Sequence, residues 1–284
     1  MRTVVVAGSL NLDYTLRVDH IPAAGETVLA KSMACAEGGK GANQAHAAAR
    51  VAQPGTRVAM VGCVGDDAAG GRMRAALERH GVDASLVMTV AAPSGQAFIA
   101  SGPKGENTIV VLGGANLAWP PGAAGAVQFA PAERAGRGAA EGAAEGAAEG
   151  AAGAGILVCQ LEVPMPVVAR LAERAHAAGW RMVLNAAPPQ SLPQGLLREG
   201  DVLVVNELEA VAVLALPALT ASAVAAASAE LGCAVVVTLG ARGMIVADLG
   251  TPATAEPAFE IEPVDTVGAG DAFVGTLAVA LAEG

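Results

Sequence analysis

The sequence has 284 residues, enough for one large α/β domain or two small ones, and its 53% of hydrophobic residues can bury a sizeable core. Charged residues make up only 15%, and the formal net charge of −10 at pH 7 argues against a nucleic acid or an anionic membrane as the partner. No apolar segment spans a bilayer without helix breakers, and the N-terminus lacks the long apolar core of a signal peptide.

The four cysteines, Cys35, Cys63, Cys159 and Cys233, lie far apart in the sequence and include no Cys-x-x-Cys pair. Their apolar surroundings predict reduced, buried thiols in a cytoplasmic protein, because disulfides persist mainly in oxidising compartments. A disulfide or a metal-binding role is the weaker alternative.

The first predicted element is a buried parallel strand at residues 4–7, which ends at Gly8. Asn11 and Asp13 follow it, and their spacing points both side chains to the same side of an extended segment. They would lie past the carboxyl end of the strand, where open α/β sheets bind ligands. An Asx turn that closes the strand is the alternative interpretation.

A glycine-rich turn at residues 37–43, Glu-Gly-Gly-Lys-Gly-Ala-Asn, leads into an alanine-rich helix at residues 44–52. It is not a phosphate-binding P-loop, because the Walker spacing and the Lys-Ser/Thr ending are absent. Its glycines, including Gly39, would bring backbone N–H groups close to a polyhydroxyl ligand, and Lys40 and Asn43 could donate to the oxygens of that ligand. A tight turn with a solvated lysine is the alternative.

Two regions carry strand signals but no helix signal. One covers residues 14–36, and the other is a hairpin of residues 96–101 and 107–112. We expect them to pair into a small sheet outside the main domain, with segments of approximately 12–36 and 95–112. Residues 136–154 repeat Ala-Ala-Glu-Gly, and glycine at every fourth position weakens a helix by roughly 1 kcal/mol each time. They are predicted to be a low-complexity surface insertion with no chemical role.

From residue 156 onward, short apolar strands alternate with helices. The predicted strands are at residues 156–160, 181–184, 202–205, 234–239 and 258–262. Such alternation indicates a parallel sheet covered by helices on both faces. The polar, glycine-rich strand ends would fall on one edge of that sheet, where we place the functional site.

The last motif, residues 265–273, reads Asp-Thr-Val-Gly-Ala-Gly-Asp-Ala-Phe and runs into an apolar helix at residues 272–282. A tight turn into a helix N-terminus presents unpaired N–H groups and partial positive charge. Gly268 and Gly270 would let the main chain approach an anion, and Asp271 could take the proton of an attacking hydroxyl, which suits phosphoryl transfer. The alternative is an aspartate favoured only by the helix dipole.

This motif resembles the C-terminal signature of the ribokinase-like (PfkB) family of carbohydrate kinases. Three further elements match in the family's order: Asn11-Leu-Asp13, residues 38–43 and Asn206-Glu-Leu-Glu209. The resemblance implies a Rossmann-like three-layer α/β sandwich with a mostly parallel central sheet and a small β-sheet lid. It implies ATP-dependent phosphorylation of the 5-hydroxyl of D-ribose, with Mg²⁺ and with K⁺ as a further candidate ion, in a homodimer formed through the lid.

The resemblance also implies a role for each matching residue. Asp271 would be the catalytic base, with Gly268, Ala269 and Gly270 as the anion hole. The sugar would be held by Asn11, Asp13, Gly39, Lys40, Asn43 and Glu162. Asn206 and Glu209 would organise the phosphates and Mg²⁺, and Glu209 would act on Mg²⁺ through water. The nucleotide would be lined by Thr238, Gly240 and Gly243. Part of a potassium site would come from Asp265 and the Val267 carbonyl. For Asn206 and Glu209 alone, a helix-capping box explains the spacing equally well.

The sequence departs from the family pattern at its end. Family members continue past the signature helix, whereas this sequence stops at Gly284. We therefore expect one kinase domain over residues 1–284 that is short at its C-terminus. Another sugar or nucleoside kinase of the family and an inactive sugar-binding remnant remain the alternatives to a ribose kinase.

Overall fold

The computed structural model describes residues 2–103, 106–131, 155–216, 218–262 and 266–284. The insertion predicted at residues 136–154 lies outside the described residues. The strands are β1 (Arg2–Ala7), β2 (Asn11–Arg17), β3 (Ser32–Gly38), β4 (Thr56–Gly65), β5 (Asp83–Val90), β6 (Gly95–Ser101), β7 (Asn107–Leu112), β8 (Ile156–Gln160), β9 (Arg181–Asn185), β10 (Val202–Asn206), β11 (Ala234–Thr238), β12 (Met244–Ala247) and β13 (Thr254–Glu256). The α-helices are α1 (Lys40–Val51), α2 (Ala68–Arg79), α3 (Ala123–Ala126), α4 (Met165–Ala177), α5 (Glu207–Leu214), α6 (Ala221–Leu231) and α7 (Ala269–Glu283), and the 3₁₀ helices are η1 (Gly114–Leu117) and η2 (Gly240–Arg242).

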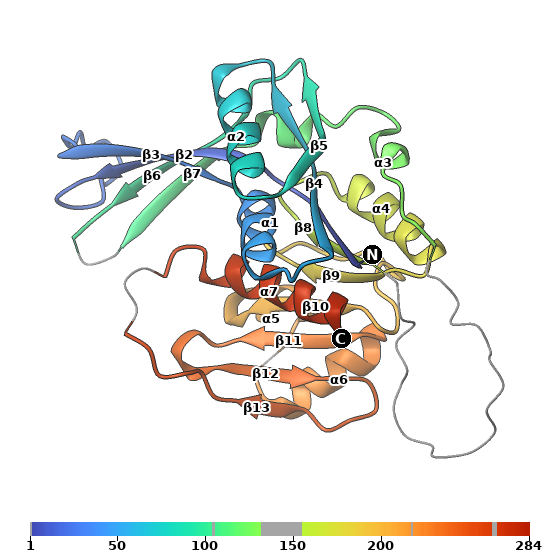
Figure 1. The fold of residues 1–284 in the computed structure, drawn as a ribbon. Coiled ribbons are helices and arrows are strands. Elements are labelled where there is room, and N and C mark those ends of the chain that lie inside the picture. The colour runs from blue at the N-terminus through green and yellow to red at the C-terminus, as the bar shows by residue number, and fades with distance from the viewer. Residues whose placement is uncertain (1, 104–105, 132–154, 217, 263–265) are drawn as a thin grey trace, which may run out of the picture.

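The central sheet has the strand order β13-β12-β11-β10-β9-β8-β1-β4-β5. The seven strands from β11 to β5 run parallel, and β12 and β13 are added antiparallel at one edge (Figure 1). This confirms the predicted α/β fold with a mostly parallel sheet. The carboxyl ends of the parallel strands meet at one edge, so their following loops lie close together.

Helices cover both faces of this sheet, and alternate residues of one strand show it. Val4 and Val6 of β1 pack in a core with α1, α2 and α7, whereas Val5 and Ala7 pack in a second core with α3, α4, α5 and α6. Strands buried on both faces read as continuous apolar runs, which is why the strand signals were strong. Among the described helices, none is long and apolar enough to cross a membrane.

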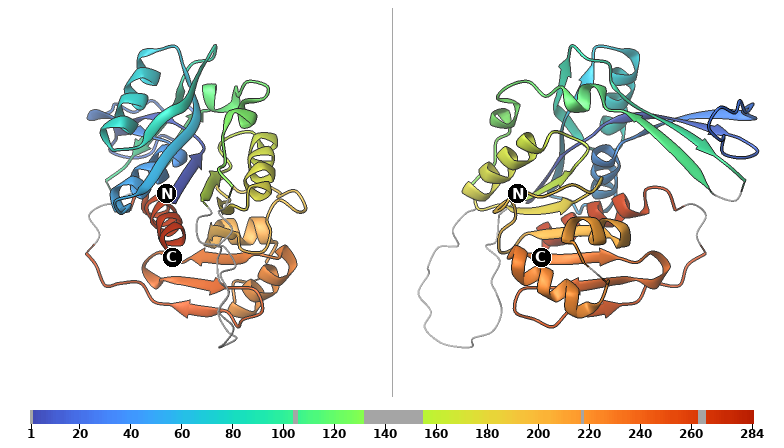
Figure 2. Two further views of the ribbon diagram at one scale, coloured as in Figure 1. Left: turned by 45° about the vertical axis from the view of Figure 1, so that its right-hand side comes forward. Right: turned by 180° about the vertical axis from the view of Figure 1, so that it is seen from behind.

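The small sheet has the order β3-β2-β6-β7 and projects from the main body (Figures 1 and 2). The two predicted segments supply its four strands, as expected. The pairing register places Asp13, Ala97 and Val111 side by side on one face, because residues opposite each other in a sheet share a face. Large apolar side chains of β7 are exposed, including Val110 at 62%.

Several predicted boundaries were wrong. The strand expected at residues 258–262 is absent; the chain pairs with β12 four to six residues earlier, as β13, and Pro257 follows it without an N–H for the sheet ladder. Within the region predicted at residues 14–36, the second strand begins only at Ser32, and the helix expected from residue 44 begins at Lys40. β5 and α6 were not predicted; β5 is an edge strand in which only Ala84 and Val87 are buried, which weakens its apolar signal.

Candidate active site

A cavity of about 200 Å³ opens at the carboxyl edge of the central sheet. Residues from α1, β10, α5, β11 and α7 line it. Eight of the predicted site residues are among them: Lys40, Asn206, Glu209, Thr238, Gly268, Ala269, Gly270 and Asp271. The structure thus brings together residues from three sequence motifs that lie far apart along the chain, and Thr238 of β11 joins them.

The N-terminus of α7 forms one wall of this cavity. Gly268 precedes the helix in a left-handed conformation with φ of 76°, which glycine adopts without steric cost. Within the described residues, the N–H groups of Gly268, Gly270 and Asp271 donate no hydrogen bond, whereas the Ala269 N–H donates to the Thr266 carbonyl at 3.2 Å. Of the three amides predicted for the anion hole, two have no acceptor among the described residues and one is used by the turn.

Asp271 is the buried carboxylate of this wall, with 8% of its surface exposed. Two side-chain amides of α1 hold it: Asn43 Nδ2 donates to Oδ2 at 3.1 Å, and Gln44 Nε2 donates to Oδ1 at 3.0 Å. Each carboxylate oxygen has two acceptor positions, so each retains one for a further donor. The carboxylate is thus oriented by protein donors and still able to accept a proton.

Two further carboxylates lie near Asp271 on the side of the small sheet. Burial, and then the charges of Glu162 and Asp271, raise the pKa of Asp13 to about 6. The Oδ1 atom of Asp13 is buried and has no hydrogen-bond partner among the described residues. Glu162 accepts hydrogen bonds from the Ser9 hydroxyl and, at 3.3 Å, from the Lys40 N–H. This excess of acceptors fits a ligand that carries several hydroxyl donors.

The glycine-rich turn before α1 owes its glycines largely to close packing of the chain. Gly39 has φ of 90°, and a Cβ atom there would lie 2.7 Å from the Asn11 nitrogen. A Cβ at Gly38 would overlap the Asp13 carboxylate, and one at Gly41 would lie 2.7 Å from the Ser9 nitrogen. These glycines let the turn lie against the β1–β2 junction and the Asp13 carboxylate; Lys40 of the turn lines the cavity, whereas Asp13 does not.

Asn11 is buried beneath the site. Its Oδ1 accepts from Asn116 Nδ2 at 2.8 Å, and Asn116 also pairs with the backbone N–H and carbonyl of Leu10. The sequence reasoning missed Asn116, which stands in η1 without any motif around it.

On the opposite side of the cavity, Asn206 and Glu209 form the capping box of α5. The Glu209 N–H donates to Asn206 Oδ1 at 2.9 Å, and the Asn206 N–H donates to a Glu209 carboxylate oxygen at 2.8 Å. The capping interpretation is therefore correct, and both residues also line the cavity. Thr238 lines it too, whereas Gly240 and Gly243 do not; their φ values of 59° and 91° belong to the turn between β11 and β12.

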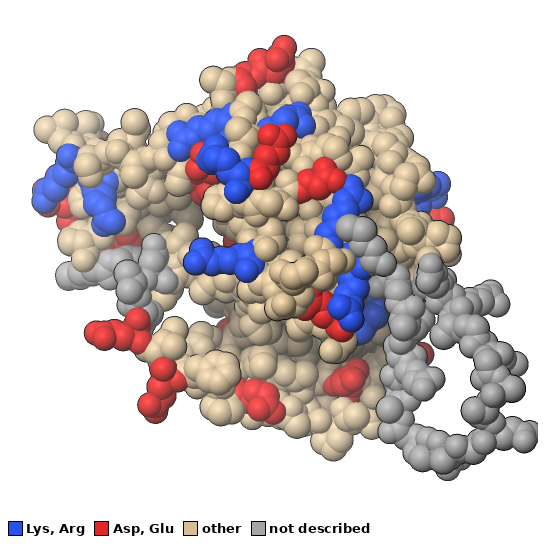
Figure 3. Space-filling view, in the orientation of Figure 1, with Lys and Arg blue, Asp and Glu red and all other residues tan. Residues whose placement is uncertain are grey.

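The described residues include no group of three or more His, Cys, Asp or Glu that could hold a metal ion by themselves. Asp265 of the predicted potassium site lies outside the described residues, and the side chain of Val267 is exposed. Figure 3 shows acidic side chains spread over the part formed by β11–β13, so an anionic nucleotide there would depend on backbone N–H groups, Lys40 and any ion it carries.

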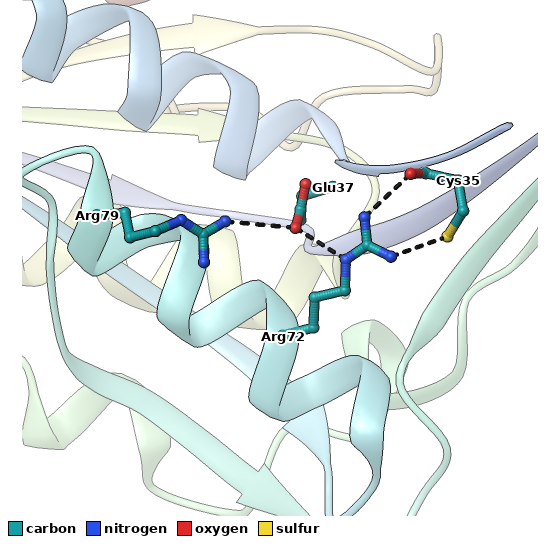
Figure 4. Close-up of polar contacts among 4 residues, drawn as sticks. All are labelled: Cys35, Glu37, Arg72 and Arg79. Atoms are coloured by element: carbon teal, nitrogen blue, oxygen red, sulfur yellow. Dashed lines mark hydrogen bonds and ion pairs between the residues drawn. The ribbon is translucent and has the colours of Figure 1, made fainter.

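Ion pairs tie the small sheet to the main body next to the glycine-rich turn (Figure 4). Arg72 of α2 donates to Glu37 at 2.9 Å and to the Cys35 carbonyl at 3.0 Å, and Arg79 lies 3.5 Å from the same Glu37 carboxylate. The hydrogen bond from Arg72 lowers the pKa of Glu37 below its usual value. Since Glu37 directly precedes the glycines of the turn, this contact links the position of β3 to the site.

The family model that describes the pfkB family carbohydrate kinases matches residues 1–284. The chain belongs to this family. It is 36% identical to a ribokinase of Bacillus subtilis, over 100% of this chain and 87% of that protein, and 34% identical to a ribokinase of Haemophilus influenzae, over 99% of this chain and 86% of that protein.

Solved structures agree with this family membership. A structure of Arabidopsis thaliana ribokinase complexed with ribose and ATP is 30% identical, with a TM-score of 0.79 over 100% of this chain and 86% of that chain. A ribokinase of Thermotoga maritima is 27% identical, with a TM-score of 0.80 over 100% of this chain and 87% of that chain.

Several polar residues of this family member were not predicted from the sequence. Gln44 is buried against Asp271, Gln160 and Asn185 are buried against Gln44, and Thr266 and Asn185 line the cavity. The only sequence signals were a glutamine directly after the glycine-rich turn and amides at the ends of two predicted strands.

Proposed function

We propose that this protein transfers the γ-phosphoryl group of ATP to the 5-hydroxyl of D-ribose. The observation that carries the proposal is the buried Asp271 carboxylate, which lines the same cavity as Gly268 and Gly270, whose N–H groups have no acceptor in the part of the chain that the structure describes. A base beside an anion hole is the arrangement that phosphoryl transfer to an alcohol needs. The relatives named as ribokinases, and the one described with ribose and ATP, support ribose and ATP as the substrates.

Different residues of the chain bind the sugar and stabilise the phosphoryl group. Asp13 and Glu162 accept hydrogen bonds from sugar hydroxyls, and Lys40 and Asn43 donate to sugar oxygens. Asp271 accepts the proton of the 5-hydroxyl as that oxygen attacks the γ-phosphorus. The N–H groups at the start of α7 stabilise the charge that develops on the phosphoryl oxygens, helped by the partial positive charge of the helix terminus.

Mg²⁺ fits this site only as an ion delivered with the nucleotide. Glu209 is the one carboxylate of α5 that lines the cavity, and one of its oxygens is already used by the capping box. A single carboxylate that acts through water is compatible with Mg²⁺, which keeps several waters and binds mainly to phosphates. The bound ion would neutralise phosphate charge. A potassium ion near Asp265 and the Val267 carbonyl stays a prediction.

We further propose a homodimer in a cytoplasmic setting. The exposed apolar residues of the small sheet, among them Phe98, Ile109 and Val111, support a partner at that sheet. ATP as a substrate and four free thiols suit the cytoplasm. Sedimentation equilibrium measures the mass: a single species of 27.8 kDa would contradict the dimer.

The function is tested with Asp271→Asn in a coupled assay of ADP release. The wild type should release ADP only with ribose and Mg-ATP together, and the variant should lose roughly 10²- to 10⁴-fold in kcat, because the amide cannot accept the proton. Asp248→Asn, in the turn after β12, is the matched control and should keep the wild-type rate. A fully active Asp271→Asn enzyme would remove the mechanism, and a preference for another sugar or a nucleoside in the same assay would replace ribose as the acceptor.

A further inference from the structure

Behind Asp271, three buried side-chain amides form a continuous line of hydrogen bonds. Gln44 Nε2 donates to Asp271 Oδ1 at 3.0 Å and to Asn185 Oδ1 at 3.1 Å, and Gln160 Nε2 donates to Gln44 Oε1 at 2.6 Å. Gln44 and Gln160 have no exposed surface, and Asn185 exposes 8%. Such a network costs free energy when it is incompletely paired, so its retention in the core needs a reason.

A main-chain carbonyl determines which atoms of these amides donate and which accept. Asn185 Nδ2 donates to the carbonyl oxygen of Val204 at 3.2 Å. A carbonyl cannot donate, so the amide of Asn185 must turn its oxygen toward Gln44. Gln160 donates to the oxygen of Gln44, which leaves the NH₂ group of Gln44 to face Asp271. A flipped Gln44 amide would present its oxygen to the carboxylate and to Asn185 Oδ1; Asn185, which is anchored to the main chain, opposes that orientation.

We propose that Gln44 is a positioning residue of the phosphoryl transfer, which holds the Asp271 carboxylate in the orientation that accepts the proton of the sugar. This inference rests on the proposed function, since it deepens the role of Asp271. Gln44 is fully buried and cannot touch the substrate, unlike its neighbours Lys40 and Asn43. Its loss should therefore lower kcat and leave the KM for ribose unchanged.

Two variants of similar volume separate the donor role from simple packing. Gln44→Met removes the donor, and kcat should fall roughly 10- to 100-fold at every pH, because a misplaced base loses much of its advantage. Gln44→Glu keeps the acceptor for Gln160, but its new carboxyl group can donate to Asp271 only while it carries a proton. At higher pH the two carboxylates repel each other, so kcat of this variant should decline as the pH rises, over a range where the wild-type kcat stays level.

Ser228→Ala is the control for lost stability, because it also removes a buried hydrogen bond, from Ser228 Oγ to the Cys233 carbonyl at 2.7 Å. Its melting temperature should fall while kcat stays at the wild-type value. A Gln44→Met enzyme with the wild-type kcat, or with a raised KM for ribose as its only defect, would overturn the proposal. So would a Gln44→Glu enzyme with the same pH profile as the wild type.

A measurement without substrate distinguishes this proposal from the proposed function. In NMR spectra of the wild type, the side-chain amide protons of Gln44 should exchange slowly with solvent and should shift in Asp271→Asn. Rapid exchange, or resonances unmoved by that substitution, would refute the contact even if the enzyme phosphorylates ribose. Slow exchange and a clear shift would support it even if the acceptor is a different alcohol.

Discussion

Gly275 of α7 lies directly against the backbone of α1 at Gln44. A Cβ atom at position 275 would overlap the Gln44 carbonyl oxygen and lie 2.8 Å from Ala47 Cβ. Glycine therefore sets how closely the two helices approach. Asp271 lies one helical turn before Gly275 in α7. The close approach of the helices therefore lets Asn43 and Gln44 of α1 donate to its two carboxylate oxygens.

Gly275→Ala should separate α1 from α7 and lower both stability and kcat. Overpacking of this kind costs about 1–3 kcal/mol, which exceeds the gain of up to about 1 kcal/mol from replacing a helical glycine. Urea unfolding and the coupled ADP assay measure the two effects. Gly71→Ala in α2 is the matched control, because a Cβ there meets no atom within 4 Å; it should be neutral or slightly stabilising. Equal stability of the two variants would show that the helices can adjust.

The raised pKa of Asp13 makes stability depend on pH. Between its ordinary value of 3.8 and about 6, the native protein keeps this proton whereas the unfolded chain has released it. Unfolding then releases a proton, so this group's contribution to the free energy of unfolding is lost as the pH rises through that window. Asp13→Asn lacks the titration, and the variant should gain stability relative to the wild type as the pH rises from 4 to 7.

The same substitution should weaken sugar binding. The amide has one uncharged acceptor oxygen where the carboxylate has two charged ones, and a hydrogen bond to a charged group is worth roughly 10- to 100-fold in affinity. Thermal unfolding from pH 4 to 7 and calorimetry with ribose measure the two effects on the same samples. A stability difference that does not change with pH would show that Asp13 titrates normally, and unchanged ribose affinity would place the sugar elsewhere.

The contact of Arg72 with Glu37 and Cys35 should restrain the small sheet. Arg72→Ala should speed hydrogen exchange of the β3 amides and raise the KM for ribose by up to about fivefold, a modest effect because the pair is exposed. High salt should bring the wild type toward the variant, since screening weakens exposed pairs. Arg170→Ala, which breaks the exposed pair with Glu173 on α4, should change neither quantity. Unaltered exchange in β3 would contradict the restraint.

The motifs predicted much of the site. Lys40, Asn206, Glu209 and Asp271 line one cavity as expected, because each follows a glycine turn or a strand end on the same edge of the sheet. Gly240 and Gly243 illustrate the limit: their positive φ values identify a turn, and the sequence signal of a turn is the same whether or not a ligand lies beside it.

The sequence by itself determined the α/β alternation, the small sheet and the edge where the site lies. These follow from apolar periodicity and from glycine and capping residues at helix starts, which act over a few neighbouring residues. Only the tertiary structure decided which amides hold Asp271 and in which direction they point. The hydrogen bonds of Asn43 and Gln44 to Asp271 join residues 228 and 227 positions apart, and that of Gln160 to Gln44 joins residues 116 positions apart. A buried amide carries no local pattern that names its distant partner.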